Sequence, residues 1–95
     1  MEKVKEVIKI INDMDIKDRL RLGVCMTSSD YTNLLYNKSH LHSVFDKKLK
    51  EIDKEYLVSY INMRKYPAVL YAMSKIMEMN EAEQNQVATF LNNQI

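Results

Sequence analysis

Two histidines, His40 and His42, are the residues of this chain whose type most readily suggests metal chemistry. Side chains two positions apart do not share a face of a helix, so one helix cannot direct both imidazoles at one ion. A metal site also needs further ligands at fixed geometry. Asp46, four residues after His42, could act as a second ligand, but this is weak support for a metal site. We therefore expect two exposed histidines at a helix N-terminus, and neither a metal site nor a cofactor site.

Residues for covalent or acid–base catalysis are equally sparse. Cys25 is the single cysteine, and no electropositive neighbour with a clear catalytic partner accompanies it, which favours a small buried apolar side chain. The carboxylates alternate with lysines as on a solvated surface, and one glycine leaves little means of building a phosphate loop or a strained catalytic turn. The sequence thus predicts no catalytic residues and no enzyme.

The tyrosines are the first positive signal, because six of them are many for a chain of this length. Tyrosine combines an apolar ring with a polar tip and has few torsions to freeze, so it is enriched at protein interfaces. The alternative is a tyrosine at the edge of the core with its hydroxyl at the surface. The candidate partner-binding residues are Tyr56, Tyr60, Met63, Tyr66 and Tyr71.

Residues 16–38 offer a second functional hypothesis, a helix-turn-helix that binds DNA. Two short amphipathic stretches flank a break near Gly23, and polar and basic side chains follow. The turn exceeds the usual 3–4 residues, and Arg19 stands where a small packing residue is expected, so two capped core helices are the alternative. The candidate nucleic-acid-binding residues are Lys17, Arg19, Arg21, Ser29, Thr32, Asn33 and Lys38.

Length and composition define the class of fold that must position these residues. With 95 residues, 46% of them apolar, and only one glycine and one proline, the sequence predicts a compact all-α domain spanning residues 1–95, built from five to seven short helices. The formal charge of +1 does not by itself require nucleic acid or a membrane surface. A lone cysteine and an N-terminus without an apolar leader are typical of a cytoplasmic protein.

The most apolar stretch, Pro67–Met79, is expected to be the central core helix. Pro67 favours a break at the preceding residue and a new helix that begins with the proline, while a single kinked helix is the alternative. The segment is too short and too interrupted to cross a bilayer. Its expected buried face consists of Val69, Leu70, Met73, Ile76 and Met77, with Ala72 within it.

Helical periodicity and capping residues place the remaining elements. A first amphipathic helix covers residues 2–13, and Asp15 caps a second helix that is expected to end at Gly23. Ser28 or Ser29 begins a third helix, and residues 31–52 form either one helix or two.

The chain after residue 52 is expected to hold two more helices beside the central one. Asp53 caps a helix that runs to Lys65. Asn80 and Glu83 form a capping box at the start of the last helix.

These observations favour a small non-enzymatic interaction protein that binds a protein partner or itself and regulates, for example inhibits, that partner by occupancy. A helix-turn-helix transcriptional regulator is the alternative. The chain is rich in Lys, Ile, Asn and Tyr, a composition typical of AT-rich genomes such as those of low-GC bacteria and their phages, so a phage or mobile element is a candidate source.

Overall fold

The computed structural model describes residues 2–28, 39–58 and 60–95. The described residues contain five α-helices, one short 3-10 helix and no strand, which confirms the all-α prediction. The radius of gyration, 11.9 Å, agrees with the roughly 12 Å expected of one compact globule of this length. The elements are α1 (Glu2–Asn12), α2 (Ile16–Thr27), α3 (Ser39–Ile52), η1 (Met63–Lys65), α4 (Pro67–Ile76) and α5 (Glu81–Asn93).

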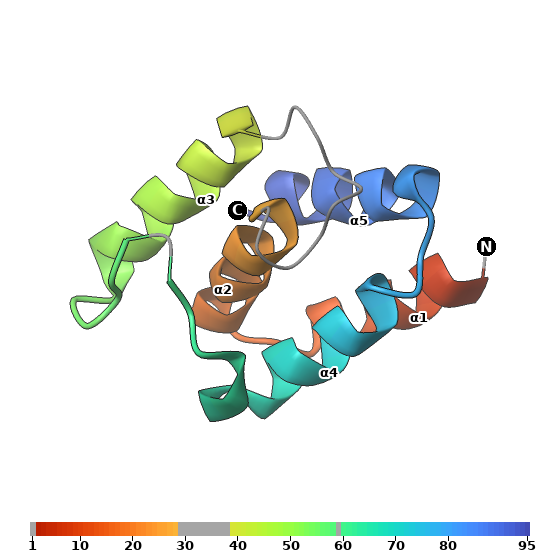
Figure 1. Cartoon of the computed structure of the whole chain (residues 1–95), viewed down its shortest axis with the longest axis horizontal. Coiled ribbons are helices and arrows are strands. Elements are labelled where there is room, and N and C mark those ends of the chain that lie inside the picture. The colour runs from red at the N-terminus through yellow and green to blue at the C-terminus, as the bar shows by residue number, and fades with distance from the viewer. Residues whose placement is uncertain (1, 29–38, 59) are drawn as a thin grey trace.

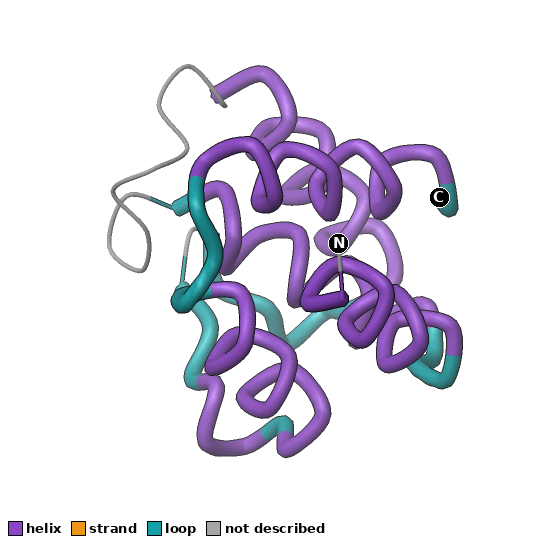
Figure 2. The backbone as a smooth tube through the Cα atoms, turned by 90° about the vertical axis from the view of Figure 1, so that its right-hand side faces the viewer, coloured by secondary structure: helices purple, strands orange, loops and turns teal. Residues whose placement is uncertain are grey.

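Helix α2 lies in the middle of the molecule and contacts α3, α4 and α5, while α1 packs on α4 and α5 (Figure 1). The predicted central helix, α4, joins this core by packing against both α1 and α2. Seen from the side, the described helices form one body (Figure 2). The core is therefore shared among several short helices, each of which buries one face against its neighbours.

The predicted helix starts are confirmed where the signal is local. The Asp15 carboxylate accepts a hydrogen bond of 2.8 Å from the Asp18 N–H, and Asn80 and Glu83 form the expected reciprocal capping box. Pro67 is the first residue of α4, after a break at Tyr66. Two separate elements, rather than one kinked helix, therefore meet at the proline.

The prediction that Gly23 ends the second helix is wrong, because α2 continues to Thr27. Gly23 is buried in the helix, and a Cβ atom built on it would lie 2.6 Å from the Phe45 ring. The glycine therefore allows α2 and α3 to approach closely and does not terminate a helix.

The predicted helix from Asp53 to Lys65 is also wrong. Asp53 lies at the end of α3, where its N–H donates to the Leu49 carbonyl. One of its carboxylate oxygens accepts from the Glu55 N–H and the other from Arg21. With both oxygens engaged in this way, the side chain closes a local turn instead of capping a helix.

Helix α4 is shorter than predicted, and its expected buried face is partly wrong. Leu70 and Met77 are 42% and 56% exposed. The helix lies at the surface, and only the middle of its apolar face packs against α1 and α2. The two sides of that face are exposed to solvent. The buried residues of α4 are Val69, Ala72, Met73 and Ile76.

The predicted third helix, which begins at Ser28 or Ser29, falls outside the described residues, as does the first part of 31–52. Within the described part, a single helix, α3, covers Ser39–Ile52. It buries Phe45 and Leu49 completely.

Candidate partner-binding groove

A small groove lies where the chain between α3 and α4 passes over α2. Its volume is about 130 Å³, below the roughly 300–1,000 Å³ of typical small-molecule pockets. A groove of this size accommodates one or two side chains of another molecule. Its lining residues are Arg21, Asp53, Glu55, Tyr56, Leu57, Tyr60, Ile61, Asn62, Lys65 and Tyr66.

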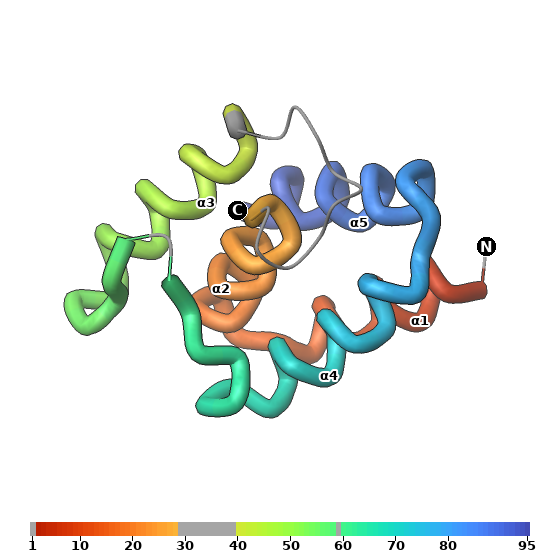
Figure 3. The backbone as a smooth tube through the Cα atoms, in the orientation of Figure 1, coloured from red at the N-terminus to blue at the C-terminus, as the bar shows by residue number. Residues whose placement is uncertain are grey.

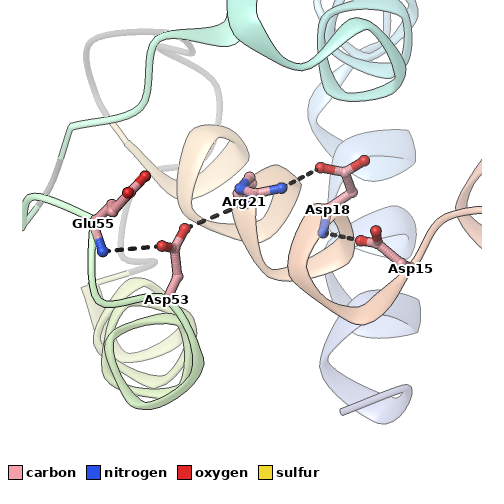
Figure 4. Close-up of polar contacts among 5 residues, drawn as sticks. All are labelled: Asp15, Asp18, Arg21, Asp53 and Glu55. Carbon is pink, nitrogen blue, oxygen red and sulfur yellow. Dashed lines mark hydrogen bonds and ion pairs between the residues drawn. The ribbon is translucent and has the colours of Figure 1, made fainter.

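Charged residues from α2 and from the end of α3 are linked beside this groove. The Arg21 guanidinium bonds to Asp18 at 2.7 Å and to Asp53 at 3.2 Å (Figure 4). Asp18 is positioned by the cap that Asp15 forms at the start of α2. The network thus ties α2 to the chain that follows α3.

The charges in this network stabilise one another. Partial burial disfavours the charged forms, but hydrogen bonds to Asp18 and Asp53 outweigh that cost and raise the pKa of Arg21. Burial also opposes ionisation of Asp53, yet hydrogen bonds from Arg21 and the Glu55 N–H, with the nearby positive charges, lower the pKa of Asp53. Both groups therefore stay ionised at neutral pH.

Two tyrosines of the groove are held by polar partners. The Arg21 guanidinium carbon lies 4.0 Å from the centre of the Tyr66 ring, within the range of a cation–π contact. The Tyr56 hydroxyl donates a hydrogen bond to Asp46, which also pairs with Lys50 at 3.1 Å. These contacts hold the two rings in place beside the groove.

The rim of the groove is formed by a turn that exposes apolar side chains. Leu57, Val58 and Tyr60 are 69%, 59% and 59% exposed. The Tyr60 N–H donates to the Leu57 carbonyl at 3.1 Å, which closes the turn, and the buried Ile61 anchors its end in the core. The turn therefore presents apolar surface from a fixed base.

The predicted partner-binding residues divide between three places. Tyr56, Tyr60 and Tyr66 line the groove together. Met63 is partly buried and packs against the core, and Tyr71 is exposed on α4, beside Lys75.

Sequence reasoning missed Leu57 as a lining residue, and also the pairing of Arg21 with Asp53. Leu57 lies in the segment that was predicted to be a helix, and that helix does not form. Arg21 and Asp53 are separated by 32 positions, and no local pattern relates residues that far apart.

The predicted nucleic-acid-binding residues are only partly available for phosphates. Arg19 donates to the Ile11 and Asn12 carbonyls at 3.0 and 3.2 Å and so caps the end of α1. Arg21 is engaged in the groove network, and Lys17 is exposed. The other candidates, Ser29, Thr32, Asn33 and Lys38, lie outside the described residues.

The residues considered for chemistry lie apart from the groove. Cys25 is fully buried, and burial raises the pKa of its thiol to about 12, so the thiol stays protonated. His40 is exposed as predicted, but the prediction that His42 is exposed is wrong, because His42 is partly buried and bonds through Nδ1 to the Thr27 hydroxyl at 3.0 Å. No three His, Cys, Asp or Glu side chains gather as metal ligands within residues 2–28, 39–58 and 60–95.

Among the described helices, none has the length and apolar character needed to cross a membrane. Comparisons of the chain with protein-family models, with curated proteins and with solved structures find no match.

Proposed function

We propose that the protein is a non-enzymatic interaction protein that binds a protein partner through this groove and its rim and regulates the partner by occupancy. The observation that carries the proposal is the gathering of Tyr56, Tyr60 and Tyr66 around one groove, next to exposed Leu57 and Val58. Aromatic side chains and an arginine, beside exposed apolar side chains, are typical of the centre of a protein interface.

The dimensions and charges of the groove favour one kind of occupant. A volume of about 130 Å³ suits an apolar side chain projecting from a folded partner better than a metabolite. The Arg21 charge is balanced by Asp18 and Asp53, so an anionic ligand would have to compete with two carboxylates. An apolar side chain of a protein would instead lie on the Tyr56 and Tyr66 rings.

A site-specific crosslinking experiment tests the proposal. A photo-crosslinking amino acid replaces Val58, which is 59% exposed, and in a second variant it replaces the exposed Gln86 on α5. Each variant is irradiated in native lysate, with and without nuclease. We expect one protein to crosslink from position 58, to resist nuclease, and to be missing from position 86.

A matched pair of tyrosines then distinguishes specific binding at the groove from non-specific binding by exposed aromatic side chains. Tyr60 and Tyr71 are similarly exposed, at 59% and 54%, but only Tyr60 lines the groove. Tyr60→Ala should abolish the crosslink from position 58, and Tyr71→Ala should leave it intact. Equal loss in both variants, crosslinking from both positions, or dependence on nucleic acid would contradict the proposal.

A further inference from the structure

The outer face of α4 carries large apolar side chains that the fold does not cover. Leu70, Tyr71 and Met77 are 42%, 54% and 56% exposed. With Ser74 they recur at intervals of three and four residues, which places them on one side of the helix. Figure 1 shows α4 at the edge of the molecule, with the rest of the fold on its other side. A surface helix normally places polar residues there.

The centre of this face can be covered without stranding a polar group. Ser74 lies between Leu70 and Met77, and its hydroxyl donates to the Tyr71 carbonyl of its own helix at 2.6 Å. A small side chain at the midpoint also lets a second helix approach closely. Covering Ser74 would therefore cost little desolvation, since its hydrogen bond is already made.

Among the described residues, the unpaired charged side chains at the two ends of α4 are of opposite sign. Two lysines also lie at the C-terminal end, where Lys75 pairs with Glu6 at 2.7 Å and Lys3 donates to the Glu78 carbonyl at 3.5 Å. Arg64 and Lys65 are exposed at the N-terminal end, and Glu78 is exposed and Glu81 half-buried past the C-terminal end. No ion pair joins any of these four side chains to another residue in the described part of the chain. Figure 3 shows the two charged segments at opposite ends of the helix.

We propose that this face pairs with the same face of a second copy of the chain, with the two α4 helices antiparallel. The antiparallel arrangement places the basic end of each helix against the acidic end of the other, whereas a parallel pair would bring like charges together. A twofold axis near Ser74 also lets the Tyr71 ring lie on Met77 of the second copy, a favourable sulfur–aromatic contact.

The contact is small. A helix of 10 residues is about 15 Å long, so the interface falls in the range of weak, concentration-dependent complexes. The inference does not rest on the proposed partner groove, because Leu70, Tyr71 and Met77 do not line that groove, and of the four charged residues at the ends of α4 only Lys65 does.

Sedimentation velocity of the full chain, from micromolar to millimolar concentration, tests the pairing. We expect a reversible monomer–dimer equilibrium whose dissociation constant rises at least about tenfold in Leu70→Glu and is unchanged in Tyr60→Ala. Leu70 is a surface residue, and a circular dichroism melt confirms that the variant still folds. A chain that stays monomeric throughout, or a dimer that Leu70→Glu does not weaken, would overturn the proposal.

Two further variants test the direction of pairing. A cysteine at the proposed axis, Ser74→Cys, should form a covalent dimer on mild oxidation, whereas Gln86→Cys should not, and the buried Cys25 stays unreactive in both. Glu78→Lys should weaken the dimer and Lys65→Glu in the same chain should restore it. If Gln86→Cys crosslinks as fast, or the charge swap fails to restore pairing, the antiparallel arrangement is wrong.

Loss of the dimer in Leu70→Glu with intact crosslinking from position 58 would leave the proposed function standing. Loss of partner crosslinking in Tyr60→Ala with an intact dimer would leave the pairing unaffected. The two proposals therefore succeed or fail separately.

Discussion

Replacing Gly23 by alanine is the sharpest test of how α2 and α3 pack. A Cβ atom at this position would meet three atoms of the Phe45 ring at 2.6, 2.7 and 2.8 Å, where ordinary contacts begin near 3.4 Å. Phe45 has no exposed surface, so its ring cannot swing into solvent. Relief of the overlap must come from movement of the two helices or from distortion of the ring.

Two opposing effects set the size of the change. Alanine is favoured over glycine inside a helix by about 1 kcal/mol, whereas overpacking a closed core costs about 1–3 kcal/mol. The overlap with three atoms of one rigid ring puts Gly23→Ala toward the upper part of that range. We expect a net destabilisation of about 1–2 kcal/mol, which lowers Tm by roughly 4–16 °C in a domain of this size.

Thermal and urea unfolding followed by circular dichroism measure this change. The control is a double-mutant cycle with Phe45→Leu, because a smaller side chain makes room for the new methyl group. In that background, Gly23→Ala should cost much less or even stabilise the fold. A rise in Tm on Gly23→Ala in the otherwise unchanged chain would refute the close contact between α2 and α3.

Three further changes test other parts of the structure. Met73→Ala, which truncates a buried side chain, should lower the free energy of unfolding by about 2–5 kcal/mol, whereas Leu70→Ala on the outer face should lower it by less than about 1 kcal/mol. Chemical denaturation compares the two variants, and equal losses of stability would place Leu70 in the core. Asn80→Ala should cost about 1 kcal/mol through loss of the cap of α5, and an unchanged urea midpoint would contradict the capping box. Arg21 lowers the pKa of Asp53 in the folded state. The Arg21–Asp53 pair therefore stabilises the fold above about pH 4, and this stabilisation is lost as the pH falls through the lower pKa of the folded state. Asp53→Asn should flatten that part of the acid unfolding curve, and an unaltered curve would show that the pair contributes nothing.

Part of the candidate site could be predicted from the sequence. The surplus of tyrosines singled out Tyr56, Tyr60 and Tyr66, which lie together at one groove. Their grouping followed from residue type and not from the helix that was expected to carry them, since residues 53–58 and 60–62 form turns and irregular chain. The apolar rim at Leu57 and Val58 was not predicted, because the sequence was expected to form a helix there and not a turn.

What the sequence alone determined is the set of features that depend on neighbours within about four residues. The Asp15 cap, the capping box at Asn80 and the start of α4 at Pro67 are all of this kind. Each involves a side chain and a backbone group that are brought together by one turn of helix, so the residue types at fixed spacing suffice to predict it.

Only the tertiary structure decided the features that depend on distant partners. Gly23 has the same local pattern as a helix terminus, and the Phe45 ring packed against it shows that it is a packing site. Asp53 has the pattern of a helix cap, but Arg21 binds its carboxylate across 32 positions. Likewise, α4 packs against α1 and α2 with only part of its apolar surface, which leaves Leu70 outside. At Gly23 and Asp53, the free energy of a long-range contact outweighs a local preference of about 1 kcal/mol or less.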